Sequence, residues 1–195
     1  MPEDLRTRTQ RAVREELMSA ALKLFVEYGY TETTVDQIAA ATGISRRSFF
    51  RYFPSKEGVV LGGLKRMGER LNGRLAEIPA EVPCWAALRQ AFEVLIEPLN
   101  RSPQESLPLV RLRMETPALQ GYYFEQISGW PKLLRPNLVD RFPEQLSADD
   151  PRPHAMAGAA LACLDAAETS WIESGAKKPF SLVLDQAMGA LGELS

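Results

Sequence analysis

The segment from Thr33 to Phe53, T-T-V-D-Q-I-A-A-A-T-G-I-S-R-R-S-F-F-R-Y-F, constrains the fold of this chain more than any other part. Thr34 is followed three residues later by a glutamine, which is the spacing of a capping box at a helix start. Gly43 suits the left-handed turn that ends a helix, and Ser45 suits the cap of the next one. That second helix ends at Phe53 because a proline follows. Two helices joined by a short glycine-containing turn predict a helix-turn-helix.

The second of these helices is basic, although the whole chain carries a formal net charge of −2. The stretch from residue 37 to residue 56 contains no Asp or Glu, but it contains Arg46, Arg47, Arg51 and Lys56. At about 100° per residue, the three arginines share one face with Phe50. Arginine pairs with guanine edges, and an apolar ring can contact a thymine methyl. We interpret this helix as a recognition helix for the DNA major groove; the alternative is that its arginines only solvate a surface helix.

Residues from about 9 to 64 resemble the DNA-binding domain of the tetracycline-repressor (TetR) family of bacterial transcription regulators. The matching motifs are a first helix ending F-V-E-Y-G-Y, then T-T-V-D-Q-I-A-A-A-T-G-I-S, then a helix ending F-R-Y-F-P-S-K-E. The resemblance implies a DNA-binding domain over residues 1–58 and a helical ligand-binding and dimerisation domain over residues 59–195. The C-terminal half of the chain is much less specific to this family than the first 60 residues are.

The same resemblance implies roles for individual side chains. Phosphate or sugar contacts are implied for Thr34, Ser45, Ser48, Tyr52 and Lys56, and base contacts for Arg46, Arg47 and Arg51. The family often has tyrosine where this chain has Phe50, so one phosphate hydrogen bond is not expected here. It usually has a small or turn-favouring residue in place of Arg47, which makes Arg47 a candidate for this protein's own sequence preference.

Apolar residues recur at helical spacing along the whole chain, and no segment alternates as a strand would, so the predicted fold class is all-α. A long fourth helix is expected from about residue 54 to residue 78, and a proline-rich loop from Pro143 to Pro153. Further helices are expected over Trp85–Leu99, Leu107–Glu115, Leu119–Phe142, Ala155–Ser174 and Leu182–Leu194. Four glycines within the fourth helix weaken it, either because another helix packs closely there or because this connector bends: Gly62, Gly63, Gly68 and Gly73.

The last two helical segments are suited to association with another helix. Small residues recur at alternating steps of four and three: Ala155, Ala159, Ala162, Ala166 and Thr169. The final segment adds apolar positions that include Val183, Ala187 and Leu191. The alternative is that both helices only close the core of one chain. In the resembled family the last two helices form a four-helix interface with their symmetry mates, so we expect a homodimer.

Large adaptable side chains lie between the basic segment and the small-residue seam: Trp85, Phe92, Met114, Tyr123 and Trp130. Such residues at helical spacing are more often core than ligand contacts. Pro98 and Pro131 nevertheless fall in helical patterns, where proline bends the axis and leaves room for a pocket. By resemblance this is the effector site, and its lining favours a small apolar or aromatic effector, with polar anchors available from Arg111, Arg113 and Glu115.

Several function classes find little support in the sequence. The calculated pI of about 5.6 argues against indiscriminate coating of nucleic acid, which needs a wide basic surface. No apolar run approaches the roughly 18 residues of a membrane span, and the N-terminus is too polar for a signal peptide, so we expect a cytoplasmic protein. The cysteines Cys84 and Cys163 lack C-x-x-C spacing, so we expect neither a metal site nor a cofactor.

The function that these observations favour is a ligand-responsive bacterial transcriptional regulator. We expect a repressor that binds a palindromic DNA operator as a homodimer and is released by its effector. The first alternative is an activator of the same fold, because operator position relative to a promoter is not visible in the sequence. The second is a helical small-molecule-binding protein or an enzyme without DNA function, but no catalytic motif is present and the lone His154 has no partner at recognisable spacing.

Overall fold

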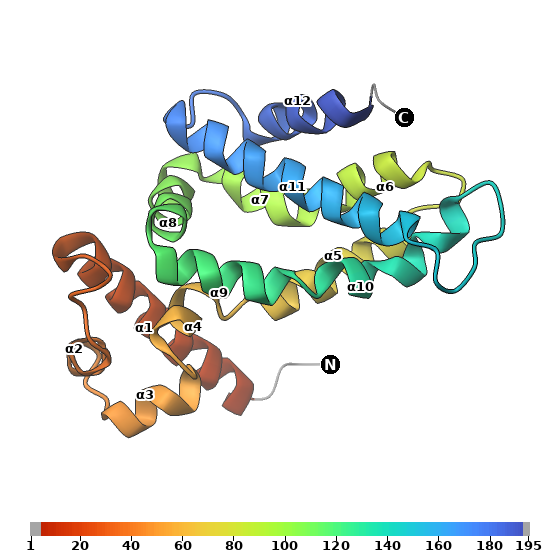
Figure 1. Cartoon of the computed structure of the whole chain (residues 1–195). Helices are drawn as coiled ribbons and strands as arrows, with labels where there is room; N and C mark the ends of the chain where they lie inside the picture. Colours follow the sequence, from red (N-terminus) through yellow and green to blue (C-terminus); the bar gives the residue numbers. More distant parts are fainter. Residues whose placement is uncertain (1–4, 193–195) are drawn as a thin grey trace. The chain divides into compact units, whose positions relative to one another are not determined.

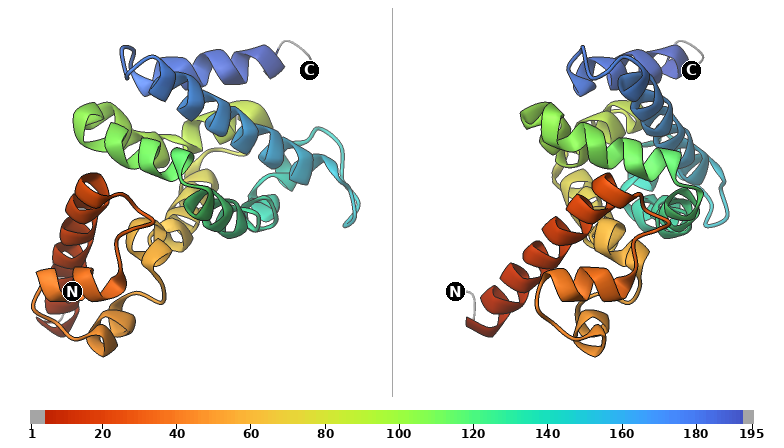
Figure 2. Two further views of the ribbon diagram at one scale, coloured as in Figure 1. Left: turned by 60° about the vertical axis from the view of Figure 1, so that its left-hand side comes forward. Right: turned by 90° about the vertical axis from the view of Figure 1, so that its left-hand side faces the viewer.

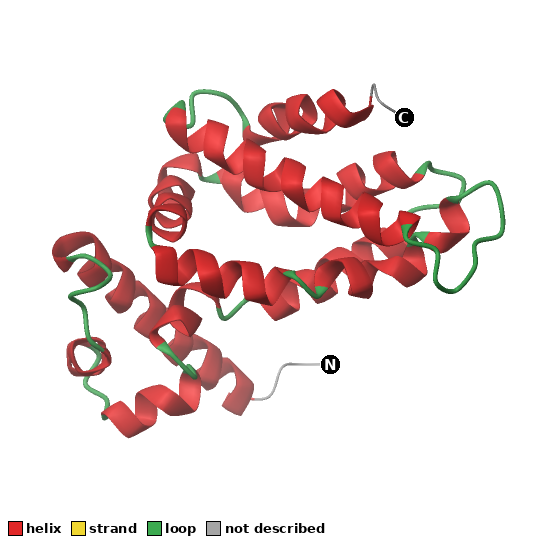
Figure 3. Ribbon diagram, in the orientation of Figure 1, coloured by secondary structure: helices red, strands yellow, loops and turns green. Residues whose placement is uncertain are grey.

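The computed structural model describes residues 5–192, with side chains from residue 8 onward. Within that range the chain forms helices joined by loops and contains no strand, which confirms the all-α prediction (Figure 3). No described helix is both long enough and apolar enough to cross a lipid bilayer. The predicted end of the last helix at Leu194 lies outside the described residues, as do both outermost ends of the predicted domains.

The chain divides into two compact units. The N-terminal unit comprises Met1–Gly63 and Thr116–Tyr122, and the C-terminal unit comprises Leu64–Glu115 and Tyr123–Ser195. The predicted domain boundary between residues 58 and 59 falls inside a short helix of the N-terminal unit, and it remains a prediction about where the two functions separate.

The N-terminal unit is built from short helices around a longer one, shown from red to orange in Figure 1. Its elements are α1 (Leu5–Tyr28), α2 (Val35–Ala41), α3 (Arg46–Tyr52) and α4 (Lys56–Leu61). Helix α1 ends where Gly29 adopts a φ of 85°, which only glycine takes without strain. The core consists of fully or almost fully buried side chains that include Leu17, Ala21, Phe25, Ile38, Phe49 and Phe53.

The C-terminal unit is a group of helices centred on α11, which packs against α6, α8, α10 and α12 (Figure 2). The elements that lie wholly in this unit are α5 (Leu64–Glu77), α6 (Cys84–Ala91), α7 (Glu93–Arg101), α8 (Pro103–Glu115), α10 (Trp130–Leu134), the 3-10 turns η1 (Arg135–Asn137) and η2 (Val139–Arg141), α11 (Arg152–Glu173) and α12 (Phe180–Gly192). Helix α9 (Pro117–Ile127) begins in the N-terminal unit and ends in this one. Trp171 and Phe180, which are fully buried, join α11 to α12 through an edge-to-face contact with ring centroids 5.6 Å apart.

The prediction of one continuous helix from residue 54 to residue 78 is wrong, because the chain breaks into α4 and α5 at Gly62 and Gly63. A Cβ atom on Gly62 would lie 2.3 Å from the Gly58 carbonyl oxygen, so only glycine fits there. A Cβ atom on Gly68 would lie 2.6 Å from Trp130 Nε1, which shows that close packing requires this glycine. Gly63 and Gly73 have open space around them, so packing does not explain those two.

Two other long helices are also shorter than expected. The segment predicted as one helix from Leu119 to Phe142 consists of α9, α10 and the two 3-10 turns. Pro131 lies in the first turn of α10, where proline is tolerated, and therefore starts a helix instead of bending one. The segment from Trp85 to Leu99 divides into α6 and α7, and Pro98 does lie inside α7.

Arg141 holds the end of α5 by donating to five backbone carbonyls. Its Nη2 donates to Leu75 and Ile78, at 2.9 and 2.8 Å. The Nη1 atom donates to Pro79 and Val82, and Nε donates to Asn137 at 2.9 Å. Carbonyls at a helix C-terminus lack partners within the helix, so this one guanidinium replaces the bonds that the end of α5 leaves open.

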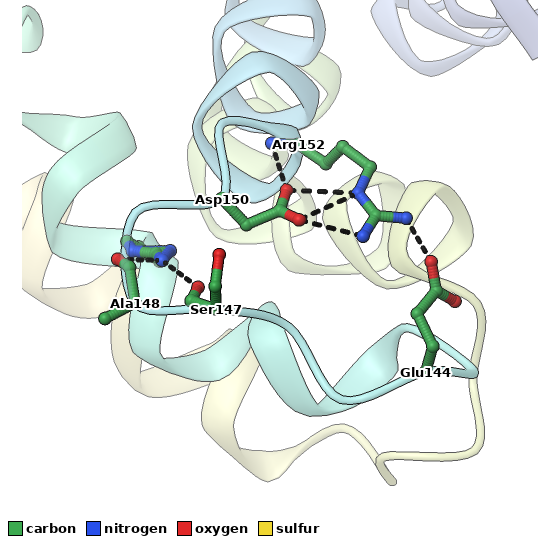
Figure 4. A network of polar contacts seen from close by, with 6 residues as sticks. Glu144, Ser147, Ala148, Asp150 and Arg152 are labelled. Atoms are coloured by element: carbon green, nitrogen blue, oxygen red, sulfur yellow. Dashed lines mark hydrogen bonds and ion pairs between the residues drawn. The ribbon is translucent and has the colours of Figure 1, made fainter.

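The proline-rich loop predicted from Pro143 to Pro153 is present but ends earlier, because α11 begins at Arg152, and charged groups hold it in place (Figure 4). Asp150 accepts hydrogen bonds from the backbone N–H and the side chain of Arg152, at 2.8 to 3.2 Å, and Glu144 also pairs with Arg152. The bonds from Arg152 lower the pKa of Asp150 to about 2. Arg135 donates to the backbone carbonyls of Ser147 and Ala148.

Arg141→Lys should lower the stability of the C-terminal unit by about 2–4 kcal/mol. Lysine keeps the charge but has three donors on one nitrogen, and each hydrogen bond that is lost costs about 0.5–1.5 kcal/mol. Urea unfolding followed by circular dichroism measures the change. The control is Arg74→Lys, because with the residues that the structure describes Arg74 makes only an exposed pair with Glu77. Equal destabilisation by the two variants would contradict the role given to Arg141.

Candidate nucleic-acid interface

Helix α2 starts with the capping box that the sequence predicts. The backbone N–H of Gln37 donates to the Thr34 hydroxyl at 3.2 Å, and the Gln37 side chain accepts from the Thr34 backbone N–H at 2.7 Å. Each of the two side chains accepts a hydrogen bond from the other residue's backbone N–H. Two N–H donors at the start of the helix, which would otherwise lack partners, are thereby satisfied. Thr34 is therefore fixed as the N-cap of α2, and it is exposed to solvent.

The turn between α2 and α3 depends on Gly43, which has a φ of 68°. Its N–H donates to Ala40, and the N–H of Ile44 donates to Ala39 at 3.0 Å, which closes the end of α2. Ser45 then caps α3 by accepting from the Ser48 backbone N–H at 3.1 Å. The predicted helix-turn-helix is thus present, and its caps lie at the predicted residues.

Helix α3 presents an apolar face to the core and a basic face to solvent. Phe49 is completely buried, and its ring contacts those of Phe50 and Phe53 at centroid distances of 5.4 and 5.9 Å. Arg47 and Arg51 are exposed, and Phe50 is 43% exposed on the same side. Among the described residues Arg47 has no hydrogen bond or ion pair, so its guanidinium is free to bind an external acceptor.

Arg46 has a partner that the sequence did not indicate. Its Nη1 lies 2.7 Å from Asp36 Oδ2, and its guanidinium carbon lies 5.4 Å from the Phe50 ring centroid. Asp36 lies just outside the acid-free stretch that made this segment appear uniformly basic. Both side chains of the pair are more than half exposed, so the pair contributes at most about 1 kcal/mol and can open.

Lys56 holds the loop between α1 and α2. Its ammonium donates to the carbonyls of Tyr30 and Thr33, at 2.7 and 2.9 Å, and lies 4.1 Å from the Tyr30 ring centroid. Burial lowers the pKa of Lys56, against the opposing effect of Glu57 and Glu32. A lysine ammonium has three donors, so one of them remains for a phosphate.

Glu57 completes this attachment from the next position along the chain. The Tyr30 hydroxyl donates to Glu57 Oε1 at 2.6 Å. Burial raises the pKa of Glu57. Hydrogen bonds from Tyr30, from its own backbone N–H and from Ser55 lower it by a larger amount, so the pKa lies below its ordinary value. The P-S-K-E motif thus joins the start of α4 to the loop before α2 and positions the helix-turn-helix.

The five predicted effector contacts have different surroundings in the C-terminal unit. Phe92 is fully buried and Met114 is half-buried, while Trp85 donates to the Met188 carbonyl of α12 at 3.2 Å. Trp130 is buried against Gly68, and the buried Tyr123 lies beneath the guanidinium of Arg113. Their roles in effector binding remain predictions.

Glu168 is a buried charged residue that the sequence analysis missed. It pairs with Arg113, and the two side chains are only 11% and 7% exposed. The other proposed anchors, Arg111 and Glu115, instead face each other at 3.8 Å on the surface. A signal was present, because Glu168 lies on the same helical face as Leu161, Leu164 and Trp171, and a carboxylate on an apolar face needs a partner.

The small residues that recur along α11, which we call the small-residue seam, are not all buried in the core of one chain. Ala155, Ala162 and Ala166 are exposed, and Ala159 and Thr169 are half-buried. On α12, Leu191 is 39% exposed and Ala187 is half-buried, while Val183 is buried within the chain itself. Leu182, which was not predicted, is 52% exposed on the same helix.

Comparison with known proteins gives matches along most of the chain. Residues 17–62 match the family model described as "Bacterial regulatory proteins, tetR family", and residues 82–194 match the model described as "MftR C-terminal domain". The putative mycofactocin biosynthesis transcriptional regulator MftR of Mycobacterium tuberculosis is 28% identical over 97% of this chain and 93% of its own length. The HTH-type transcriptional regulator TcmR of Streptomyces glaucescens is 34% identical over 63% of this chain and 57% of its own length.

A solved structure with the same arrangement of helices is Thermus thermophilus FadR, described as a TetR family transcriptional repressor in complex with lauroyl-CoA. It is 26% identical, with a TM-score of 0.58, over 92% of this chain and 93% of FadR. These relatives are transcriptional regulators and not enzymes.

Glu57 should make the stability of the N-terminal unit depend on pH. Its folded pKa lies below its ordinary value of 4.5, so its contribution is complete above that value and is lost as the pH falls. Glu57→Gln should therefore lose less stability than the wild type between about pH 6 and pH 3. Glu16→Gln, on the exposed side of α1, serves as the control and should keep the wild-type dependence. Identical profiles for all three proteins would contradict the role of Glu57.

Proposed function

We propose that this chain, which belongs to the TetR family of bacterial regulatory proteins, is a ligand-responsive repressor that binds a palindromic operator as a homodimer. It is a DNA-binding transcriptional regulator, as its family membership establishes. The observation that carries the finer proposal is the exposed basic face of α3, on a helix fixed by a cap at one end and by buried aromatic rings behind it.

The side chains of this face divide by the contacts that they are suited to make. The Arg47 guanidinium has no partner in the described part of the chain, so it can donate two parallel bonds to the O6 and N7 atoms of guanine. Phe50 offers an exposed ring for a thymine methyl, and Arg51 extends the basic face by a turn. Contacts with the phosphates and sugars of DNA are assigned to five residues at or near the helix caps, namely Thr34, Ser45, Ser48, Tyr52 and Lys56.

Arg46 supports DNA binding in a second way, through its pair with Asp36. In the free protein the Arg46 guanidinium neutralises the Asp36 carboxylate, which lies next to the basic face of α3. A phosphate or base acceptor can take over the Arg46 guanidinium at small cost, because an exposed ion pair is weak. Such contacts release counterions, so affinity should fall steeply as salt rises.

The exposed seam of α11 supports the homodimer. Small side chains let the backbone of another helix approach closely, and Leu182 and Leu191 of α12 add apolar surface that the chain leaves uncovered. A dimer with twofold symmetry presents two α3 helices, and symmetric proteins bind symmetric sites. The operator is therefore assigned two half-sites in inverted orientation.

The effector is assigned to the C-terminal unit, where buried aromatic residues accompany one buried ion pair. The lauroyl-CoA bound by Thermus thermophilus FadR is a reason to include acyl thioesters among apolar and aromatic candidates. The segment Thr116–Tyr122 of the N-terminal unit is connected at both ends to residues of the C-terminal unit. A conformational change in the C-terminal unit can therefore be transmitted to this segment through the polypeptide chain. A true effector must bind less tightly when operator is present, because coupling between two sites is reciprocal.

Arg47→Ala should weaken binding to the preferred operator by about 1–3 kcal/mol and relax the preference at one base position in each half-site. Fluorescence anisotropy with the operator and with single-base variants measures both effects. Arg74→Ala removes an exposed arginine from α5 and should leave both unchanged. A uniform loss of affinity with unaltered base preference would show that Arg47 contacts the backbone only.

Ala162→Glu should convert the dimer to a monomer, because it places two carboxylates at the centre of the proposed seam. Sedimentation velocity gives the mass in solution. Ala86→Glu introduces the same charge at an exposed position of α6 and should remain dimeric. A dimeric Ala162→Glu variant would place the interface elsewhere.

A further inference from the structure

Three side chains form a polar centre inside the C-terminal unit. Arg113 from α8 donates through Nη2 to Glu168 Oε2 from α11. The Arg113 guanidinium carbon lies 4.0 Å from the ring centroid of Tyr123 from α9, and Tyr123 is 6% exposed. The centre therefore joins helices α8, α9 and α11 through buried polar side chains. These side chains can form more hydrogen bonds than they make with one another.

Most of the hydrogen-bonding capacity of the centre is unused. A guanidinium has five N–H donors, but Arg113 makes one hydrogen bond with the described residues. Among the same residues, Glu168 Oε1 accepts no bond, and the Tyr123 hydroxyl has no partner. Buried polar groups are paired in the great majority of cases, so three incompletely paired side chains in contact call for an explanation.

The comparison with Arg141 shows that this is not a general feature of the chain. Arg141 is only half-buried, yet its Nε, Nη1 and Nη2 atoms all donate to backbone carbonyls. Across the described residues, Arg135 Nη1 is the one fully buried side-chain nitrogen or oxygen atom without a partner. The unpaired atoms of Arg113, Glu168 and Tyr123 are therefore not fully enclosed, and each keeps some accessible surface.

Charge decides which chemical group fits these free atoms. Asp165, one turn before Glu168, adds a second carboxylate near the single guanidinium. Burial raises the pKa of Glu168 to about 7; Arg113 opposes this shift, and Asp165 adds to it. An anionic group would meet two carboxylates, and a cationic group would compete with Arg113 for Glu168. A neutral group with an acceptor beside a donor complements the centre without adding charge.

We propose that Arg113, Glu168 and Tyr123 receive a neutral carboxamide group of the effector. The carbonyl oxygen accepts from the Arg113 guanidinium and the Tyr123 hydroxyl, and the amide N–H donates to Glu168 Oε1. The apolar part of the effector lies against the neighbouring aromatic side chains. This inference rests on the proposed ligand-responsive function, and it assigns the chemical class that the site selects.

The proposal also gives the site a connection to the DNA-binding unit. Arg113 lies three positions before Thr116, and Tyr123 directly follows Tyr122, so the two residues flank the segment that groups with the N-terminal unit. A ligand bonded to both side chains constrains both ends of that segment. An ion pair that only fixed α8 to α11 would require neither Tyr123 nor a ligand.

Four probes with one alkyl chain test the selectivity: decanamide, methyl decanoate, decanoate and decylamine. Binding to the full-length protein is measured by tryptophan fluorescence and confirmed by calorimetry. Decanamide should bind at least about tenfold more tightly than the other three, which is the effect of one or two well-formed hydrogen bonds. Equal or tighter binding of the ester, acid or amine, or no binding of decanamide, would overturn the proposal.

Tyr123→Phe separates the amide site from a structural ion pair, because it keeps the ring beneath Arg113 and removes only the hydroxyl. It should weaken decanamide about three- to tenfold and leave decylamine unchanged. The matched control is Tyr122→Phe, at a half-buried neighbouring position, which should retain wild-type affinity for all four probes. An unaltered amide preference in Tyr123→Phe would show that Tyr123 serves packing alone.

Operator binding distinguishes failure of this inference from failure of the proposed function. A chain that binds operator tightly but shows no amide preference keeps its assigned function and loses this site. A chain that binds decanamide selectively but no operator keeps the site and loses the proposed function.

Discussion

A helix of six or seven residues does not persist alone in water, and this constraint governs the N-terminal unit. Helices α2, α3 and α4 are all this short, and each begins with a side-chain cap, at Thr34, Ser45 and Ser55. Their remaining stability comes from burial of residues such as Ile38 and Phe49. Because α3 cannot exist without these supports, the basic face that it presents has one fixed position within the unit.

The residues that could be predicted are those whose partners are close in sequence. The caps at Thr34 and Ser45 each act on a residue three positions away, so spacing alone identified them. The contacts of Lys56 with Tyr30 and Thr33 were not predicted, because these residues are 26 and 23 positions away and nothing local indicates them. Glu168 and Arg113 are 55 positions apart, so their spacing does not identify them as a pair, although the apolar face around Glu168 indicates that it needs a partner.

The long helices were overestimated for a related reason. Apolar periodicity continues through Gly62 and Gly63 and through the Ser128–Gly129 break, although the backbone stops being helical there. Periodicity records which side of a segment is apolar, and it does not record where hydrogen bonding is interrupted. The break after α4 coincides with the boundary at residue 63 between the two units, so two shorter helices stand where one long helix was predicted.

A symmetric pair of α3 helices should bind a specific DNA duplex, and selection from a random DNA library by the purified protein measures whether it does. We expect enrichment of an inverted repeat, with half-sites separated by about one helical turn or a multiple of it, and an affinity that falls steeply with salt. Enrichment of no sequence, or of a single unrepeated site bound by a monomer, would contradict it.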